Sequence, residues 1–599
     1  MKQLSIAESK WGGYVGYLLD YVENAQLLDE ELWKLFVKQY RKQNDVDNGW
    51  RGEYWGKMMR GAALTYQCTG NEQLYACMEN TVRDLLSVQD ADGRISSYPR
   101  DKEFDGWDMW CRKYVLLGNL YFYEVCKDES LKEEILKALS LHLDYIVAHI
   151  GAEAGKKSIF ETSHFYGCLN SCSILEPVVK MYKLTKKESY FAFAKYIVEG
   201  GFCADMNLIE ECLRKEKYPY EFAHTKAYEM MSCFQGLLEY YEVTGEEKYF
   251  TAAKNFADMV AETDITMIGC SGCRGEFFDH SSVTQTIPNE GDMQETCVTV
   301  TWMNLCYKLL QMTNDVKYAD WMEHSALNAM GGAVNTESQR ALQARVIDGT
   351  TNQPFTGERG ILPFDSYSPL YNDHRGKGIG GFNVMEEGKS YGCCACIGSA
   401  GVALTGLFGV MSSEDGIYIN LYQDCITQTK IKESPVTVSI KDSLMQDGCA
   451  YVQVEGNVKF PLKLRIPSWS DTYKVRINGV QVCVEAKNGY IVLEEEWTKE
   501  AICLELDVSI KKHFLNGKMA FTKGAYVLSS DQRLRGKIKP FVTVGKVKEE
   551  RVVNQDFYNN VTVRLAVGEE HVTLCDYAQA GKNYDDENSI ISVWFDIEE

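Results

Sequence analysis

The stretch Leu238-Glu-Tyr-Tyr-Glu-Val-Thr-Gly245, followed by Tyr249, decides the fold because it joins the end of one helical pattern to the start of the next. An aromatic-rich apolar segment runs up to Gly245, and Gly is a common residue directly after a helix end. A second helical pattern then opens on Tyr249. The stretch therefore predicts a helical hairpin whose turn lies near residue 244.

The same sequence pattern recurs through the first part of the chain. Copies stand at residues 64–70, 180–185 and 310–314, and a weaker copy stands at 121–128. The predicted turns fall near residues 69, 127, 185, 244 and 313. This spacing of roughly sixty residues is the length of two helices with their connections.

Such hairpins cannot bury their inner faces alone, but they can do so when they stack in a ring. Five copies are visible, and a sixth would come from the first helix or from the apolar segment 397–408. The pattern predicts an (α/α)6 toroid over residues 1–411. An open α-solenoid is the alternative arrangement.

After about residue 412 the pattern changes from helical to alternating, which is typical of half-buried strands. Asn478-Gly479 and Asn488-Gly489 stand between such runs and signal tight hairpins. We expect an antiparallel β-sandwich over 412–511, and a second sandwich or a continuation of the first over 512–599. These parts would support the toroid and shape one rim. The expected strands lie at residues 416–422, 460–467, 473–477, 490–493, 519–522, 525–528, 561–565 and 591–595.

The composition describes a folded, acidic protein of two or three units. The 599 residues carry a formal charge of −22, and the pI is near 5.0. No broad basic surface is available for phosphates, which argues against nucleic acid or an anionic membrane as partner and favours a small neutral substrate. The start of the chain shows no apolar signal region, and nowhere do about 18 apolar residues run together. We expect a soluble, cytoplasmic protein, and a homodimer is one open expectation.

Cysteine is unusually frequent, with 21 residues in a chain that shows no export signal. Reduced thiols are therefore the default, and a disulfide framework is not expected. Most of these residues, such as Cys68 and Cys203, stand within apolar patterns. Buried small hydrophobic side chains explain them.

Two short segments combine metal-ligand types. Glu295 and Cys297 stand two residues apart ahead of a helical pattern, and Gly392-Cys-Cys-Ala-Cys396 offers adjacent thiols at the entry to another helix. A helix N-terminus favours thiolates. One Glu and three Cys suit tetrahedral Zn²⁺, which takes thiolate and carboxylate together. Glu276, in a Gly-rich loop, offers a further carboxyl group.

Two alternatives remain for these thiols. The pair Cys393-Cys394 could be buried and inert, because adjacent cysteines arise by chance in a chain this rich in Cys. A structural Zn²⁺ site could instead form from Cys270 and Cys273, a CxxC motif, together with Cys394 and Cys396. Glu295 argues against the second alternative, since a structural thiolate site needs no carboxylate.

A His and an aromatic cluster are further candidates. His224 lies at the start of a predicted helix and could face the centre of the ring, although a core or surface role is as common. The cluster 106–114, with Trp107, Asp108 and Tyr114, could line a sugar site, and so could the segment 50–57. Core aromatics with Lys and Arg side chains that reach the surface are the alternative.

Four motifs resemble those of a known family. They are Gly-Glu-Phe at 275–277, Glu-Thr-Cys at 295–297, Cys-Cys at 393–394 and Leu-Arg-Ile-Pro-Ser-Trp at 464–469. On these motifs the chain resembles the glycoside hydrolases that contain the β-L-arabinofuranosidases. The resemblance implies an (α/α)6 barrel followed by β-sandwiches, a Zn²⁺ ion bound by one Glu and three Cys, and a Cys nucleophile.

Carried over by motif, the resemblance implies that Cys393 is both nucleophile and zinc ligand. It implies that Glu295, Cys297 and Cys394 are the other ligands and that Glu276 is the acid/base residue. The chain departs from the family where a pocket His is replaced within Arg112-Lys-Tyr114, and again within residues 169–172. The resemblance also implies sugar contacts for His224 and Tyr367.

The resemblance implies a retaining exo-glycosidase, β-L-arabinofuranosidase-like, that acts on a small oligosaccharide or glycoside. One alternative is an ordinary toroid glycosidase in which two carboxylates do the chemistry and zinc is structural. The other is a zinc-stabilised carbohydrate-binding protein without catalysis. The sequence does not identify the sugar, the ring size or the linkage.

Overall fold

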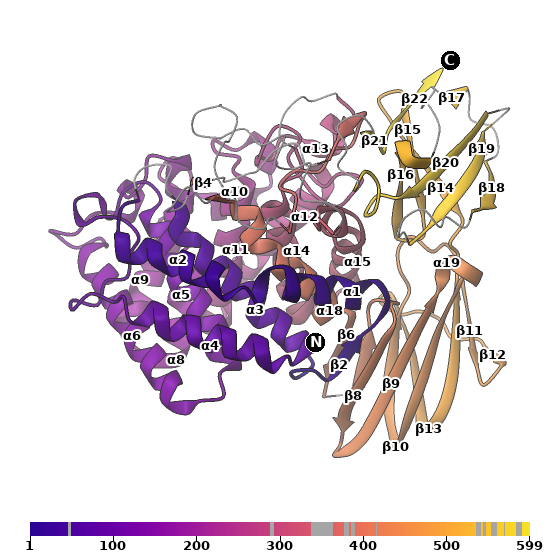
Figure 1. The fold of residues 1–599 in the computed structure, drawn as a ribbon, viewed down its shortest axis with the longest axis horizontal. Coiled ribbons are helices and arrows are strands. Elements are labelled where there is room, and N and C mark those ends of the chain that lie inside the picture. The colour runs from indigo at the N-terminus through magenta and orange to yellow at the C-terminus, as the bar shows by residue number, and fades with distance from the viewer. Residues whose placement is uncertain are drawn as a thin grey trace.

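The computed structural model shows a helical body, two large β-sheets and a small two-stranded sheet (Figure 1). The first residues lie where the helical body meets the lower sheet, and the chain ends in the upper sheet. The structure describes residues 1–45, 50–287, 293–336, 363–375, 383–384, 390–414, 416–534, 541–542, 547–552, 560–567, 570–582 and 590–598.

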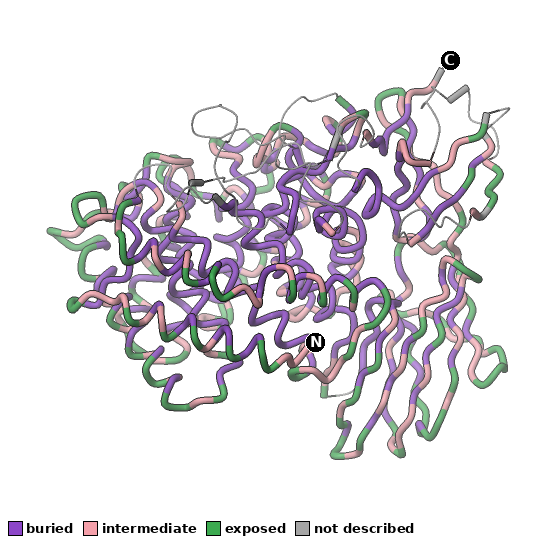
Figure 2. Tube along the Cα trace, in the orientation of Figure 1, coloured by how far each residue is buried: buried purple, intermediate pink, exposed green. Residues whose placement is uncertain are grey.

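Within the described residues, six inner helices form a closed ring. Each contacts the next along the chain, and the last contacts the first. Their side chains are almost entirely buried, and the interior of the helical body is correspondingly purple in Figure 2. The closure excludes an open solenoid. The six helices are α3 (Glu53–Thr69), α5 (Asp108–Val125), α8 (Leu175–Thr185), α11 (Ala227–Thr244), α14 (Thr296–Thr313) and α18 (Cys393–Gly409).

Each inner helix has an outer partner, and the sixth pair joins distant parts of the chain. α1 (Gly13–Val22) packs on α18, so the first helix and the predicted segment 397–408 together complete the ring. The (α/α)6 toroid is thereby confirmed. The other outer helices are α4 (Glu72–Leu86), α6 (Glu129–His149), α9 (Glu188–Glu199), α12 (Glu247–Thr263) and α15 (Val316–Ser325).

Four of the predicted turns share one local geometry. The inner helices α3, α8, α11 and α14 each end on a Thr, whose hydroxyl accepts a hydrogen bond of 3.1–3.3 Å from the amide two residues later. The residue after each Thr is left-handed, which ends the helix and reverses the chain. These residues are Gly70, Lys186, Gly245 and Asn314. The fifth turn follows Val125, where Cys126 is extended instead.

The inner helices α3 and α5 cross at two glycines. A Cβ on Gly118 would lie 2.8 Å from the Cα of Gly56, and a Cβ on Gly56 would overlap the carbonyl oxygen of Tyr114. Backbones this close leave no room for a methyl group. The crossing also fixes the helix that carries Lys57, the next residue.

We expect Gly56→Ala to destabilise the folded protein by about 1–3 kcal/mol, because the added methyl group must push α3 and α5 apart in a close-packed interior. Ala forms helices better than Gly, so helix propensity alone would make the variant more stable. A loss of stability would therefore report the packing effect. Urea unfolding followed by Trp fluorescence measures it. A stability equal to or above that of the parent chain would mean that the two helices do not cross so closely.

The first sheet is built on two strands of 17 residues, β10 (Cys449–Arg465) and β13 (Tyr490–Leu506), which pair antiparallel along their length. The predicted turns at Asn478-Gly479 and Asn488-Gly489 both have positive φ at both residues, as tight hairpin turns require. The sheet runs from β11 (Tyr473–Ile477) and β12 (Val480–Val482) through β13 and β10 to β9 (Ser434–Ser443) and β8 (Cys425–Ile431), with a branch to β7 (Gly416–Ile419) and β6 (Val410–Ser413).

The first residues of the chain belong to this sheet. β1 (Lys2–Gln3) pairs with β6, and β2 (Ser9–Trp11) pairs with β8. Residues before α1 therefore leave the helical ring, whereas the sequence assigned them to it. The predicted domain limits at 411 and 511 stay predictions.

The second sheet holds the C-terminal strands. β15 (Lys518–Lys523) and β16 (Tyr526–Asp531) pair at its centre, and β14 (Ile510–Leu515) joins β15 through a further Asn-Gly turn at 516–517. The other described strands include β19 (Thr562–Val567), β20 (Glu570–Asp576), β21 (Ile590–Ser592) and β22 (Phe595–Glu598). The arrangement is sandwich-like, as expected.

The motif at 464–469 fastens the first sheet to the ring. The guanidinium of Arg465 is fully buried and pairs with Asp320 and with Glu323 on α15, and it donates to the Asn420 carbonyl at 2.6 Å. Trp469 donates its indole N–H to the Glu323 carboxylate at 2.8 Å. The motif is thus a joint between ring and sheet, which agrees with the supporting role predicted for the β part.

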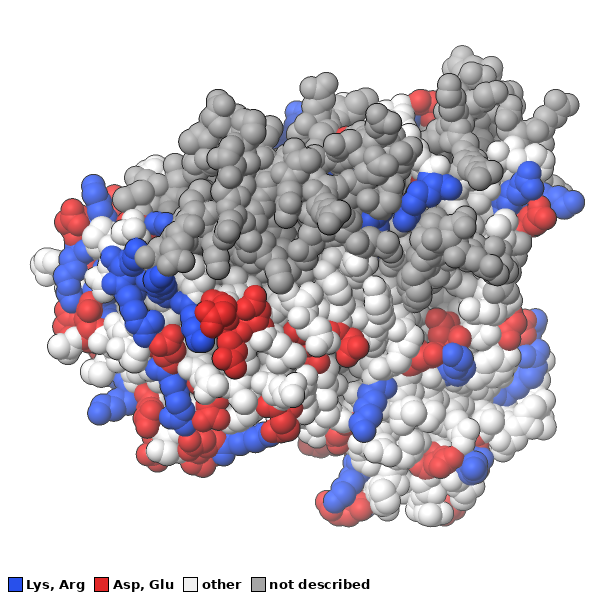
Figure 3. Space-filling view, in the orientation of Figure 1, with Lys and Arg blue, Asp and Glu red and all other residues white. Residues whose placement is uncertain are grey.

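The surface in Figure 3 mixes both signs of charge, and Lys or Arg side chains alternate with Asp or Glu over the described part of that face. None of the described helices is long and apolar enough to span a membrane.

Candidate metal centre and active-site mouth

The N-terminal ends of the inner helices carry most of the predicted site residues. Inner helices of successive hairpins run in the same direction around a ring, so their N-terminal ends line one mouth. Residues at or just before these ends include Glu53 on α3, Trp107 before α5, Lys226 before α11, Glu295 before α14 and Cys393 on α18.

Four side chains at the N-terminal ends of α14 and α18 form a compact buried cluster. Ligand atoms of Glu295, Cys297, Cys393 and Cys394 all lie within 4.8 Å of one another. The Cys297 sulfur is 3.5 Å from the Cys393 sulfur and 3.4 Å from the Cys394 sulfur, and the latter two are 3.9 Å apart. The Glu295 Oε1 atom is 3.2 Å from the Cys394 sulfur and 3.7 Å from the Cys393 sulfur. Residues almost 100 positions apart in the chain thus come together as the sequence predicted.

These distances fit one tetrahedral metal ion. Zinc–sulfur bonds of about 2.3 Å at tetrahedral angles place two sulfurs about 3.8 Å apart. The sulfur–sulfur distances of the cluster, 3.4–3.9 Å, are close to this spacing. The second carboxylate oxygen of Glu295 is buried and has no hydrogen-bond partner among the described residues, as a carboxylate free to turn toward an ion would be. Three thiols and one carboxylate are a donor set that zinc accepts.

Cys393 differs from its neighbours in charge and exposure. Contacts with the sulfurs of Cys297 and Cys394 lower its pKa well below the usual value, and nearby Lys side chains add to this. Burial instead raises the pKa of Cys297 and of Cys394 well above the usual value. Cys393 is 7% exposed, whereas Cys297 and Cys394 are 0% exposed. Of the three cysteines, the one whose pKa is lowered is therefore also the one that is not completely buried.

A buried ion pair that the sequence analysis missed lies under the cluster. Lys57 Nζ is 3.0 Å from Glu53 Oε1 and 3.8 Å from the Cys297 sulfur, and both side chains of the pair are buried. Burial raises the pKa of Glu53 to about 8, and the charge of Lys57 opposes this rise. The sequence left two interpretations of the segment 50–57 open, a sugar platform or core aromatics with Lys and Arg side chains that reach the surface. The signal that could have revealed the pair is an acidic and a basic residue four positions apart at the start of an otherwise buried helix.

We expect Lys57→Met to destabilise the protein by about 3–5 kcal/mol, because it leaves the Glu53 carboxylate buried without its partner. Folding raises the pKa of Glu53 above its unfolded value, so its contribution to stability is present at low pH and is lost as pH rises. The parent protein ionises Glu53 near pH 8 and the variant only at higher pH, so the loss of stability should grow between about pH 7 and pH 9. Unfolding by urea at both pH values measures it. Lys34→Met, which breaks an exposed pair with Glu31, is the matched control and should change little. A pH-independent deficit would contradict the assignment to Glu53.

Glu276 is linked to the cluster by Lys226. The Lys226 ammonium contacts the Glu276 carboxylate, and the backbone amide of Ala227 donates to the Glu276 carbonyl at 3.1 Å. Burial lowers the pKa of Lys226, but the charges of Glu229, Glu295 and Cys393 oppose this effect and the pKa is raised. Lys226 therefore contacts Glu276 and also interacts electrostatically with the cluster. The sequence analysis did not single out Lys226.

His224 lies near the same mouth. Its Nε2 atom is 2.7 Å from Asp205 Oδ2, and the ring is about a quarter exposed. Cys203, which the sequence analysis counted among core thiols, lies in a loop and within 4.8 Å of both groups. The predicted sugar contact of His224 stays a prediction.

The aromatic cluster divides into a mouth part and a scaffold part. Trp107 is half-buried, packs against Trp50 and Phe165, and its indole N–H has no hydrogen-bond partner among the described residues. Tyr114 is buried, and its hydroxyl contacts that of Tyr228. Both remain candidates for contact with a ligand.

Asp108 belongs to the scaffold, in contrast to its predicted place in the sugar site. It is fully buried and accepts hydrogen bonds from Ser96 Oγ at 2.5 Å, from the Phe104 amide at 2.7 Å and from Arg112 Nε at 2.8 Å. Both carboxylate oxygens are therefore occupied. Arg112, at the position where the chain departs from its relatives, is likewise buried and pairs with Glu103 at 2.9 Å.

Tyr367 lies next to the predicted ligand segment. The neighbouring Ser366 carbonyl accepts the Thr296 amide at 2.9 Å, and the Ser368 amide donates to the Met293 carbonyl at 2.9 Å. Tyr367 itself is 9% exposed. Its position beside the segment that holds Glu295 keeps it a candidate for the site.

The rival CxxC site does not form in the described structure. The Cys270 thiol donates to the backbone carbonyl of Glu295 at 3.5 Å, and Cys273 accepts a hydrogen bond from Gln294 at 3.5 Å. Neither of them, nor Cys396, is among the clustered ligand atoms of the described residues. The structural zinc site proposed for these thiols is therefore wrong.

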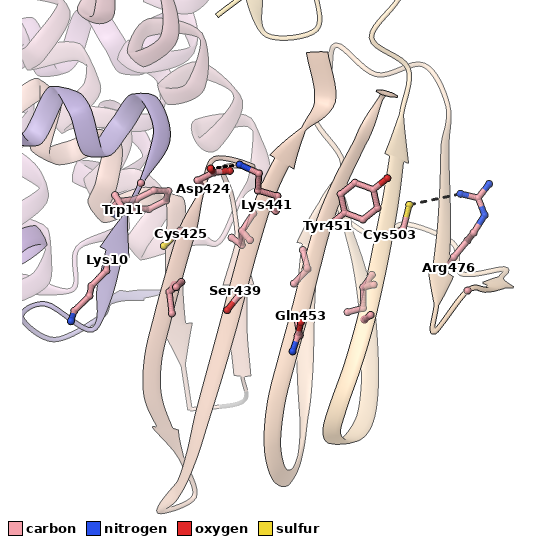
Figure 4. A pocket seen from close by; sticks show the side chains of 17 residues that line it. Lys10, Trp11, Asp424, Cys425, Ser439, Lys441, Tyr451, Gln453, Arg476 and Cys503 are labelled. Atoms are coloured by element: carbon pink, nitrogen blue, oxygen red, sulfur yellow. Dashed lines mark hydrogen bonds and ion pairs between the residues drawn. The ribbon is translucent and has the colours of Figure 1, made fainter. Parts of the chain in front are cut away.

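A large hollow elsewhere lacks the same chemistry. It measures about 800 Å³ and lies on a face of the first sheet, between β2 and β11 (Figure 4). Its lining carboxylate, Asp424, is paired with Lys441 at 2.6 Å, and its thiol Cys503 lies 3.8 Å from Arg476. None of the predicted site residues lines it.

The chain is similar to known proteins over most of its length. Residues 17–343 match the family profile described as beta-L-arabinofuranosidase, GH127 catalytic domain, and residues 416–508 match that of the GH127 middle domain. The non-reducing end beta-L-arabinofuranosidase of Bifidobacterium longum subsp. longum is 20% identical over 532 residues, which cover 80% of this chain and 74% of that protein.

Solved structures show the same fold. A GH127 beta-arabinofuranosidase superposes with a TM-score of 0.74 at 16% identity and covers 100% of this chain and 98% of its own. A GH127 beta-L-arabinofuranosidase from Geobacillus stearothermophilus T6 superposes with a TM-score of 0.66 at 17% identity, covering 98% of this chain and 97% of its own. A helical ring followed by β domains is therefore an architecture that other proteins share.

Proposed function

The chain belongs to the GH127 β-L-arabinofuranosidase family and is a glycoside hydrolase, and from this premise we propose that it is a retaining, exo-acting β-L-arabinofuranosidase with Cys393 as nucleophile and Glu276 as acid/base. Glu295, Cys297, Cys393 and Cys394 would hold a zinc ion. One observation supports the proposal: of the three cysteines in the buried cluster, the one whose pKa is lowered is also the one that is not completely buried.

In the first step the Cys393 thiolate attacks the anomeric carbon of the bound sugar. The bond from that carbon to the glycosidic oxygen breaks, and the Glu276 carboxyl gives its proton to the departing oxygen. The aglycone leaves as an alcohol, and the sugar stays bonded to the Cys393 sulfur. A thiolate takes the place of the second carboxylate that retaining glycosidases ordinarily use.

In the second step the Glu276 carboxylate accepts a proton from a water molecule, whose oxygen attacks the anomeric carbon. The carbon–sulfur bond breaks, and Cys393 leaves as a thiolate. Two inversions give net retention of configuration. When bound, zinc supplies the stabilisation of this sulfur as an anion both before attack and on departure.

The remaining residues would position the sugar and the proton donor. Lys226 contacts Glu276 and interacts electrostatically with Glu295 and Cys393, so it would hold the carboxyl group in place. Trp107, whose indole N–H has no hydrogen-bond partner among the described residues, is one aromatic candidate for contact with a sugar hydroxyl. Tyr114, His224 and Tyr367 are the other proposed contacts, whereas the engaged carboxylate of Asp108 takes it out of this set.

Hydrolysis of 4-nitrophenyl β-L-arabinofuranoside, followed by proton NMR, tests the proposal. We expect release of the sugar with β configuration before mutarotation, and no release from the α anomer. An initial product of inverted configuration would contradict the cysteine mechanism. Absence of hydrolysis with any aryl glycoside would favour a binding protein.

A further inference from the structure

A second group of ligand-type side chains lies outside the Glu295 cluster. The Cys203 sulfur, an Asp205 carboxylate oxygen and a His224 ring nitrogen lie within 4.8 Å of one another. Cys203 is buried, His224 is about a quarter exposed and Asp205 is largely exposed. The group therefore has one face in the protein and one face toward solvent.

Three loops meet at this group, and their backbones are unusual. Tyr166 and Cys168 have left-handed φ values of 48° and 68°, with Gly167 between them at 59°. Phe202, directly before Cys203, has a φ of 72°. Left-handed conformations are unfavourable for side chains of this size and persist only where the surroundings impose them. The amide of Ala204 ties two of these loops together by donating to the Gly167 carbonyl at 2.9 Å.

The Cys203 and His224 side chains fill the space between these loops beside Gly167. A Cβ on Gly167 would overlap the Cys203 sulfur and lie 2.8 Å from His224 Nε2. Burial raises the pKa of the Cys203 thiol, and contacts with the backbone amides of Asp205 and Met206 oppose that rise. A bound metal ion would favour the thiolate, the form that binds metal.

We propose that Cys203, Asp205 and His224 bind a second zinc ion, with the fourth position open to solvent. A thiolate, an imidazole and a carboxylate together favour zinc over magnesium or calcium, which take oxygen ligands alone. Three protein ligands and one open position are the arrangement of a zinc ion that can still accept water or a hydroxyl oxygen.

The second ion would fix part of the mouth. Binding through His224 Nε2 leaves the Nδ1–H as a donor with a fixed direction. His224 stands two residues before Lys226, which contacts Glu276. The site would thus anchor the segment that carries Lys226. The proposal does not depend on which sugar the enzyme cleaves or on whether Cys393 is the nucleophile.

Zinc content per chain, measured by elemental analysis after extensive dialysis, tests the proposal. We expect two zinc ions in the parent protein, one in Cys203→Ser and one in Cys394→Ala, because each variant removes a different site. Cys483→Ser changes an exposed thiol and should keep two. Asp205→Asn, at a largely exposed carboxylate, should weaken the second ion selectively in competition with a chelator, and it serves as the readout if Cys203→Ser does not fold.

A second readout is the visible spectrum after cobalt substitution. Cobalt bound in the second site should give a thiolate charge-transfer band that Cys203→Ser removes while the bands of the Glu295 cluster persist. A parent protein with one ion, unaffected by Cys203→Ser and Asp205→Asn but lost in Cys394→Ala, would overturn the second site and leave the first. A protein that binds no zinc at all would overturn both.

Discussion

Cys393→Ser is expected to lower kcat by on the order of 10⁴-fold or more, as loss of a catalytic nucleophile does in other enzymes. A Ser hydroxyl is not ionised near neutral pH and cannot replace the thiolate in attack or departure. The other three side chains of the cluster remain, so most of the zinc should remain as well. Steady-state kinetics on an aryl β-L-arabinofuranoside measures kcat, and zinc measured on the same sample gives the metal content per chain.

Cys396→Ser is the matched control for this variant. Cys396 lies on the same helix, α18, is also buried and stands outside the ligand cluster of the described residues. It should keep activity and zinc content within a fewfold range. Near-normal turnover by Cys393→Ser would favour the rival glycosidase in which two carboxylates act and zinc is structural.

Glu276→Gln is expected to lower kcat by about 10²–10⁴-fold on substrates with poor leaving groups, because no proton then reaches the departing oxygen. A 4-nitrophenol leaving group needs little protonation, so the first step should be affected much less with such a substrate. The second step still lacks its base. The sugar should therefore accumulate on Cys393, visible as a burst of nitrophenol and as an added pentose mass on the intact protein.

The control for this variant is Glu262→Gln, an exposed carboxylate that bonds to Tyr218. It should behave as the parent enzyme. If Glu276→Gln instead lowered activity equally for good and poor leaving groups and left no adduct, Glu276 would not be the proton donor, and the neighbouring Lys226 contact would need another explanation.

The hairpins of the ring could be predicted from the sequence because their turn chemistry is local. A Thr followed by Gly, Lys or Asn ends a helix through hydrogen bonds within a few residues, and this pattern repeats. Closure of the ring is not local. The contact of α1 with α18 joins segments almost 400 residues apart, and the pairing of β1 and β2 with the first sheet is equally remote. Nothing in either segment alone specifies its partner.

The cluster of Glu295 with three cysteines could be predicted because its residue types are rare together. A Glu and a Cys two positions apart, and two adjacent Cys, each stand at a helix N-terminus. The buried charges were harder to predict. Lys57 and Lys226 resemble surface lysines in the sequence, and only the fold shows that they reach Glu53 and Glu276.

The outcomes for Asp108 and Cys203 have similar reasons. Asp108 stands among aromatics and was expected in the sugar site, but its oxygens serve the loop before α5 and Arg112 four residues later. Cys203 has an ordinary apolar neighbourhood in the sequence. Its proximity to His224 depends on left-handed residues that no sequence pattern indicated.

The most direct test of the central claim is anomalous scattering from a crystal of the purified protein, recorded on both sides of the zinc absorption edge. We predict an anomalous peak enclosed by the Glu295 carboxylate and the sulfurs of Cys297, Cys393 and Cys394, with metal–sulfur distances of about 2.3 Å. The absence of a zinc peak among these four side chains, or a peak there that Cys393 does not contact, would contradict the account.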